Sequence, residues 1–306
     1  MVMEKSVVKK LVFFSVCAAL FWAGAGFAAS TAGNNSWFAY DAMLLGGHFN
    51  GKWVAAKKLM ESDRIPYQGQ PSLVYGPGGL EGRGEVARVL REEDRPFPST
   101  DGLVVKTDRG REFDEGSARL AMNGGWNAVP RQPLVMSPDN GTYRDIVRKY
   151  LERHGLPGVN PQMVQLMKVD LEGDGVDEII ICAQNIVPAN TGAFNWDLGW
   201  PLVATGMGFP TGSYRGNYSL VLLRKIVNGQ VREIPLVSFI ALKDGTPEDA
   251  EQVSPPLAKV CQLADLDGDG VLEIIVANNY YEGYAYEVYA IKGGEAVMVL
   301  DNGAGV

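Results

Sequence analysis

An acidic, glycine-rich motif occurs twice in this chain, and it limits the possible folds more than any other feature. Residues 164–181 read VQLMKVDLEGDGVDEIII and residues 259–276 read KVCQLADLDGDGVLEIIV, so the copies are 95 residues apart. In each copy, two apolar and β-branched runs flank a loop of acidic and glycine residues, which predicts a strand, a loop and a second strand. The duplication therefore predicts two copies of one structural unit in the second half of the chain.

A predicted β-hairpin follows each copy of the motif. Asn-Gly or Gly-Gly between two β-prone runs favours a tight hairpin turn. The expected segments are Tyr218–Val227, the turn Asn228-Gly229 and Gln230–Ser238 in the first unit, and Tyr284–Lys292, the turn Gly293-Gly294 and Glu295–Leu300 in the second. The units are residues 163–240, which contain an insert over residues 186–217, and residues 258–301. Each unit is thus expected to hold four strands, which is the content of one propeller blade.

Residues 35–138 are expected to form a β-rich N-terminal region of unknown type. Short β-prone runs alternate there with Gly, Pro, Asn and Asp, the residues that favour turns. The predicted elements are the strands Lys52–Ala55, Ser72–Tyr75, Glu85–Leu90 and Leu103–Lys106, and a short helix over Ala55–Glu61.

One further helix is predicted over residues 142–155, directly before the repeats. Thr142 lies three residues before Asp145, which favours a capping arrangement, and Gly155 favours a stop. His154 in the last turn is interpreted as a partner of the helix dipole. The expected fold is therefore mainly β, with propeller-like four-stranded units of which two are visible, one short helix before them and a β-rich N-terminal region.

The first 29 residues are interpreted as a signal peptide. Three lysines lie within the first ten residues, an uncharged and mostly apolar stretch runs from Leu11 to Phe27, and small residues follow. A secretory signal has this order, whereas the alternative, a membrane anchor, needs about 20 apolar residues. The sequence thus predicts an exported protein, periplasmic or secreted, with no stable membrane anchor after the signal is removed. In such a compartment Cys182 and Cys261 would either pair or remain buried thiols.

The two acidic loops contain the candidate metal ligands. Carboxylates recur at positions 1, 3, 5 and 9 of each loop, position 6 is Gly, and the Val at position 7 offers a backbone carbonyl. Oxygen ligands in this number suit Ca²⁺ better than Mg²⁺ or a soft transition metal. The alternative is a solvated acidic turn. The candidate ligands are Asp170, Glu172, Asp174, Val176 and Glu178 in the first loop, and Asp265, Asp267, Asp269, Val271 and Glu273 in the second.

An EF-hand is excluded, because its loop needs Glu at position 12, where these loops have Ile181 and Val276 in apolar strands. The stretch from Asp265 to Glu273 and the apolar run after it instead resemble the FG-GAP or VCBS-type repeat of integrin-like β-propellers. That resemblance implies calcium-ligand roles for the residues of both loops named above, and hence two Ca²⁺ sites. Exported bacterial proteins that pair such repeats with an unassigned N-terminal region look similar to this chain.

Two functions remain open on the sequence. The chain has 28 Lys and Arg against 36 Asp and Glu, and this net charge of −8 argues against nucleic acid as a partner. The first hypothesis is an extracytoplasmic calcium-binding module for a protein or glycan ligand. Its candidate contact residues, which would otherwise pack in the core, are Trp196, Trp200, Tyr280, Tyr281 and Tyr284. The alternative is a secreted hydrolase with an unrecognised active site in residues 35–138. No familiar catalytic motif is present, so enzymatic activity is not predicted. His48 is interpreted as structural.

Overall fold

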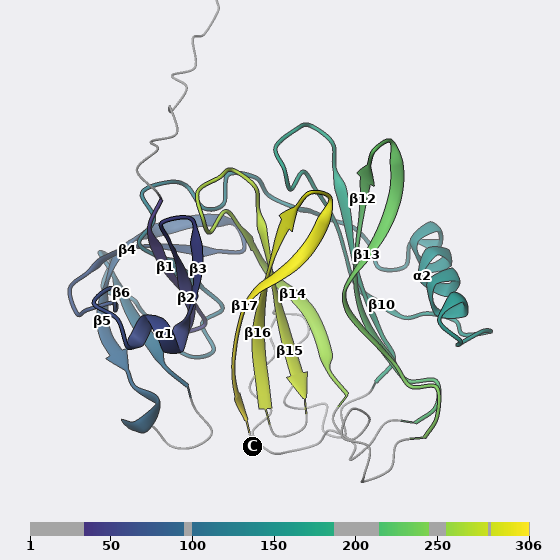
Figure 1. Ribbon diagram of the computed structural model, residues 1–306, viewed down its shortest axis with the longest axis horizontal. Helices are drawn as coiled ribbons and strands as arrows, with labels where there is room; N and C mark the ends of the chain where they lie inside the picture. The colour runs from purple at the N-terminus through teal and green to yellow at the C-terminus, as the bar shows by residue number, and fades with distance from the viewer. Residues whose placement is uncertain (1–33, 95–99, 187–213, 245–254, 281–282, 306) are drawn as a thin grey trace, which may run out of the picture. The chain divides into compact units, whose positions relative to one another are not determined.

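The computed structural model describes residues 34–94, 100–186, 214–244, 255–280 and 283–305 (Figure 1). The signal peptide predicted over residues 1–29 and most of the insert predicted over residues 186–217 lie outside these ranges. The fold is mainly β, as the sequence predicts. Its strands are β1 (Ser36–Tyr40), β2 (Met43–Phe49), β3 (Lys52–Ala55), β4 (Pro71–Gly76), β5 (Gly79–Leu90), β6 (Gly102–Thr107), β7 (Glu112–Phe113), β8 (Leu120–Met122), β9 (Leu134–Val135), β10 (Met163–Val169), β11 (Glu178–Gln184), β12 (Tyr218–Val227), β13 (Gln230–Ile240), β14 (Leu257–Ala264), β15 (Glu273–Tyr280), β16 (Gly283–Lys292) and β17 (Glu295–Gly305).

Strands β1 to β8 form one antiparallel sheet, called here the N-terminal sheet. Its order is β3-β2-β1-β8-β4-β5-β6-β7, and an additional pairing of Met43 with Gly102 joins β2 to β6. This pairing closes β2, β1, β8, β4, β5 and β6 into a ring. Alternate side chains of β1, such as Trp37 and Ala39, pack inside it with the short helix α1 (Ala56–Met60). The region predicted only as β-rich is therefore a closed ring of strands with its own apolar core.

The two repeats form two further antiparallel sheets. The order β13-β12-β11-β10-β9 makes the first repeat sheet, and β14-β15-β16-β17 makes the second repeat sheet. Both predicted hairpins are confirmed, with Val227 paired to Gln230 and Lys292 paired to Glu295. All four turn residues, Asn228-Gly229 and Gly293-Gly294, have positive φ, which the tight primed turns of hairpins require.

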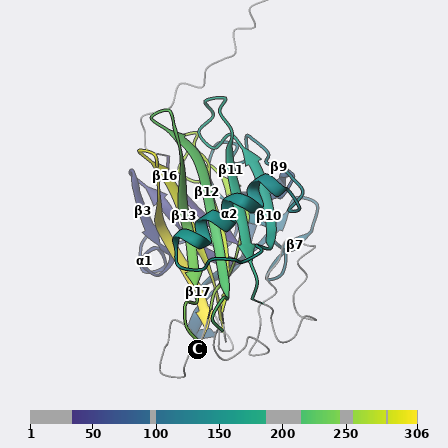
Figure 2. The same cartoon turned by 90° about the vertical axis from the view of Figure 1, so that its right-hand side faces the viewer.

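The second repeat sheet is covered on both faces. One face, which includes Ile275 and Tyr286, packs against side chains of the N-terminal sheet. The other, which includes Ile274 and Val276, packs against the first repeat sheet. Because β15 is buried on both sides, its residues 274–277 are continuously apolar instead of alternating. The outer face of the first repeat sheet is covered by helix α2 (Gly141–Arg153), which lies across it in Figure 2.

Helix α2 begins differently from the prediction. The predicted cap, Thr142, is not the N-cap: Asn140 occupies that position in an extended conformation. Its side-chain oxygen accepts a hydrogen bond of 3.1 Å from the backbone N–H of Thr142. Asn is among the strongest N-cap residues, and here it takes the role because it lies one residue before the first helical residue.

Replacing Asn140 by Ala is expected to lower the free energy of unfolding by about 1 kcal/mol, the usual cost of losing an N-cap. The matched variant Thr142→Ala is expected to change it by less than about 0.5 kcal/mol, as at an exposed site. Urea unfolding of both variants would measure the difference. Equal effects would contradict the assignment of Asn140 as the cap.

The two cysteines are free thiols. Cys182 packs in the core between the two repeat sheets, whereas Cys261 packs against the core between the second repeat sheet and the N-terminal sheet. They do not pair because they belong to different cores. Burial raises the pKa of Cys182 to about 12, which keeps its thiol protonated at neutral pH.

Within the described residues, no helix has the length and apolar composition that a transmembrane span requires.

Candidate metal centre

Each acidic loop joins the first two strands of its repeat. Loop one (residues 170–178) connects β10 to β11, and loop two (residues 265–273) connects β14 to β15. In loop two the Asp265 carboxylate accepts hydrogen bonds from the backbone N–H groups of Gly268 (2.6 Å) and Gly270 (3.1 Å). Both glycines have positive φ, which lets the chain curl around this carboxylate.

Three carboxylates converge in loop two. Asp265, Asp267 and Asp269 each offer one oxygen, and these oxygens all lie within 4.8 Å of one another. Asp265 is buried and Asp269 is exposed, so the group opens toward solvent on one side. No Lys or Arg in the described part of the chain forms an ion pair with any of the three. This group could hold a metal ion.

The pKa values of these acids report the concentration of negative charge. Burial, together with the neighbouring Asp267 and Asp269, raises the pKa of Asp265 to about 6. Burial and then the Asp269 charge raise the pKa of Asp267. Burial and the charges of Asp267, Asp269 and Asp265 hold the pKa of Glu273 well above its usual range. A bound cation would reverse this cost, because it favours the ionised carboxylates.

The other two predicted ligands of loop two have different surroundings. Glu273 is 2 % exposed, and its carboxylate accepts a hydrogen bond of 2.7 Å from the backbone N–H of Leu266. It therefore ties the end of the loop to its start and is not part of the converging group. The half-buried side chain of Val271 packs against the core between the two repeat sheets.

The N-terminal region holds loop two in place through backbone contacts. Ser36 donates to the carbonyl of Leu266 (2.8 Å), and the indole N–H of Trp126 donates to the carbonyl of Asp265 (2.8 Å). The side chain of Asn34 donates to the carbonyl of Gly268 (2.8 Å). Sequence analysis gave no signal for these contacts, since the partners lie more than 100 residues apart.

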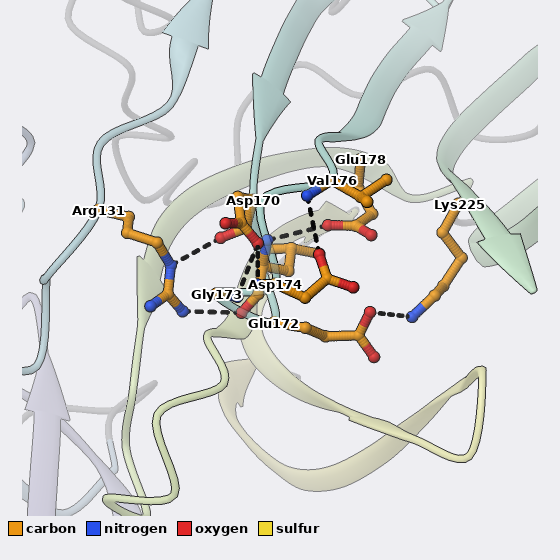
Figure 3. A network of polar contacts seen from close by, with 9 residues as sticks. Arg131, Asp170, Glu172, Gly173, Asp174, Val176, Glu178 and Lys225 are labelled. Carbon is orange, nitrogen blue, oxygen red and sulfur yellow. Dashed lines mark hydrogen bonds and ion pairs between the residues drawn. The ribbon is translucent and has the colours of Figure 1, made fainter.

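Loop one has the same backbone design. The Asp170 carboxylate accepts hydrogen bonds from the N–H groups of Gly173 and Asp174 (Figure 3). It also accepts one from the N–H of Gly175, and Glu178 accepts one from the N–H of Leu171. Burial alone would raise the pKa of Asp170, but these N–H groups outweigh it and the pKa is lowered.

The side chains of loop one, however, do not converge. Glu172 points to Lys225 on β12, whose ammonium lies 2.7 Å from the Glu172 carboxylate (Figure 3). The carboxylate of Asp174 accepts a hydrogen bond from the N–H of Val176 (2.8 Å). Among the described residues, the only group of acids with metal-ligand spacing is the one in loop two. The structure thus brings three of the ten predicted ligands together.

Arg131 joins the two loops. Its guanidinium donates to the carbonyls of Asp170 (2.7 Å) and Leu171 (2.9 Å) in loop one, and to that of Gly270 (2.6 Å) in loop two. The carbonyl of Leu171 also accepts the N–H of Leu272 (2.8 Å). The loops are therefore neighbours linked by backbone hydrogen bonds and one shared cation.

The aromatic residues singled out from sequence are not part of the converging group where the structure describes them. Trp196, Trp200 and Tyr281 are outside the described residues. Tyr284 is buried against Tyr286, at a ring distance of 6.0 Å.

Both histidines pack against aromatic rings, and the charge of His48 also opposes the rise in the pKa of Asp267 in loop two. His48 is buried beside Trp53, with ring centroids 4.9 Å apart. His154 follows α2 as its C-cap and lies over Tyr150, at a ring distance of 4.1 Å.

Comparison with models of known protein families, with curated proteins and with solved structures finds no match to this chain. The functional argument therefore depends on the geometry of the acidic centre.

Proposed function

We propose that this chain is an exported calcium-binding repeat protein that serves as a binding or interaction module for a protein or glycan ligand. The observation that carries the calcium assignment is the convergence of Asp265, Asp267 and Asp269 within 4.8 Å, without an ion pair to any described Lys or Arg. Three carboxylates this close repel one another strongly, and a divalent cation offsets that repulsion.

Calcium fits this donor set better than other metals. The converging group contains only oxygen donors, which suit Ca²⁺ and Mg²⁺ more than Zn²⁺ or copper. Calcium takes six to eight oxygens in tolerant geometry, so waters and backbone carbonyls can complete a shell that opens to solvent at Asp269. Magnesium demands a tighter octahedron and gives up its waters reluctantly.

The repeat assignment and the export assignment have separate support. The motif and the four consecutive strands that each repeat contributes, β10–β13 in the five-stranded first repeat sheet and β14–β17 in the second, support a relation to FG-GAP or VCBS repeats and to propeller blades. The basic, apolar and small-residue order of the first 29 residues supports export.

Support for an interaction role comes from exposed apolar side chains on the two hairpins. Ile226 and Val231 belong to the β12–β13 hairpin, and Val297 and Met298 to the β16–β17 hairpin; all four are about half exposed. The ion pair of Arg232 with Glu295 joins the two hairpins. Exposed apolar patches of this kind favour contact with a protein partner.

The alternative, a hydrolase with its site in residues 35–138, has less support. A cavity of about 300 Å³ in this region is lined in part by Glu61, Glu92 and Asp101, but these acids do not converge as those of loop two do. The ring of strands there is filled with apolar side chains. A cavity of about 370 Å³ lies beside it, lined in part by Tyr40, Val129 and Cys261, and no Asp, Glu, His or Ser of the described residues lines it.

Isothermal titration of the calcium-free protein is expected to show binding of one Ca²⁺ per chain. Asp267→Asn is expected to weaken that binding about 100-fold, since it removes one charged ligand from a three-carboxylate group. The matched loop-one variant, Asp174→Asn, is expected to leave it within about twofold, because Asp174 is not part of the converging group. Absence of calcium binding to the wild-type protein would contradict the proposed function.

A further inference from the structure

The two repeats can be compared residue by residue through their strand pairing. In the first repeat sheet Ile179 pairs with Arg224, and in the second the equivalent Ile274 pairs with Tyr289. The registers therefore match. One residue further along, the first repeat has a lysine and the second has an alanine.

That lysine is Lys225, and the alanine is Ala290. The Lys225 side chain is 3 % exposed, and its ammonium lies 2.7 Å from Glu172 of loop one. Ala290 is 1 % exposed and its side chain is an uncharged methyl group, so the second repeat has no charged side chain at this position. The two loops share their backbone design and differ in the cation that the neighbouring strand supplies.

We propose that the residue at this position, Lys225 on β12 and Ala290 on β16, decides which acidic loop binds a divalent cation. Lys225 neutralises the carboxylates of loop one, whereas Ala290 supplies no charge, so loop two binds a metal ion. The inference rests on the proposed function, because it assigns the calcium-binding capacity to one loop.

The charges around loop one support this assignment. Lys225 pairs with Glu172, and Lys168 pairs with Asp177 at 2.7 Å. A metal ion entering loop one would have to separate Glu172 from the ammonium of Lys225. That would leave the buried ammonium of Lys225 with only the charge of Glu178 to balance it and a second cation nearby, which is unfavourable.

Arg131 differs less between the loops. It donates to backbone carbonyls of both, and no described hydrogen bond joins it to a carboxylate, although its charge helps to lower the pKa of Asp170. The cation that forms an ion pair with a predicted ligand of one loop only is Lys225 on β12.

Reciprocal exchange of the two residues tests the proposal by the number of Ca²⁺ ions bound in calorimetric titration. Wild-type protein is expected to bind one. Lys225→Ala, alone or with Glu172→Asp to copy the three aspartates of loop two, is expected to bind two. Ala290→Lys is expected to bind no Ca²⁺ with an affinity higher than that of an isolated surface carboxylate. Circular dichroism checks that each variant is folded.

Lys225→Met and Ala290→Met are the controls for size without charge. Lys225→Met is expected to bind two Ca²⁺, like Lys225→Ala, and Ala290→Met is expected to retain one. If Ala290→Lys does not fold, the Lys225 variants alone test the inference. Two Ca²⁺ bound by the wild type would overturn this inference and leave the proposed function standing. One Ca²⁺ in every folded Lys225 variant would also overturn it. If the wild type binds no Ca²⁺, the proposed function is contradicted. The inference is then tested separately by whether Lys225→Ala gains a bound Ca²⁺; no gain would overturn it.

Discussion

Replacing Arg131 by Met is expected to lower the free energy of unfolding by about 3–5 kcal/mol, measured by urea unfolding in the presence of a chelator. The guanidinium makes three charge-assisted hydrogen bonds, to the carbonyls of Asp170, Leu171 and Gly270. Hydrogen bonds to charged groups contribute about 1.5–3 kcal/mol each, and water recovers part of the loss because Arg131 is only half-buried. Met has a similar length and keeps the packing of the side chain.

The matched control is Arg88→Met. Arg88 has a 60 % exposed side chain and faces Glu112 at 3.8 Å, so its loss is expected to cost less than about 0.5 kcal/mol. A loss below about 1 kcal/mol for Arg131→Met would mean that the two loops are held together mainly by their other contacts, such as the one between Leu171 and Leu272.

Calcium is expected to raise the melting temperature of the protein by about 5–10 °C when its concentration is 100 times the Kd. A ligand that binds only the folded state adds about 2.7 kcal/mol under that condition. For a folded unit of this size, each kcal/mol corresponds to about 2–4 °C. Magnesium at the same concentration is expected to give a much smaller shift, because Mg²⁺ demands near-ideal octahedral geometry and gives up its waters reluctantly.

Scanning calorimetry with and without a chelator measures this shift. Asp265→Asn is expected to abolish it, whereas Asp170→Asn, the equivalent change in loop one, is expected to preserve it. Equal melting temperatures with calcium and with chelator would show that loop two is an acidic turn. A shift lost equally in both variants would contradict the assignment of the ion to loop two.

The hairpins could be predicted from sequence because their signals are local. Asn228-Gly229 and Gly293-Gly294 lie directly between β-prone runs, and their positive φ values are those that such residues favour. The closure of the N-terminal ring could not be predicted in this way. It depends on a pairing between Met43 and Gly102, which no periodicity or turn residue encodes.

The same distinction applies to the candidate site. The carboxylates of both loops belong to the repeated sequence motif, so the sequence alone identifies these acids. Lys225 lies 53 residues from Glu172, and Arg131 lies 139 residues from Gly270. Only the packing of strands brings these cations to the loops, and for that reason sequence analysis predicted two equivalent calcium sites where the structure has one converging group.

The position of the second repeat sheet has a consequence for the order of folding. During synthesis, strands β14–β17 follow both sheets that they cover. Until those strands arrive, the outward apolar face of the N-terminal sheet and the inner face of the first repeat sheet lack their partner. N-terminal domains generally fold first during synthesis. Here the segments made first would expose apolar surfaces to water until β14–β17 have been synthesised. A chain cut before Leu257 should therefore aggregate, and passage across a membrane in an unfolded state would postpone the collapse of all three sheets until the central one is available.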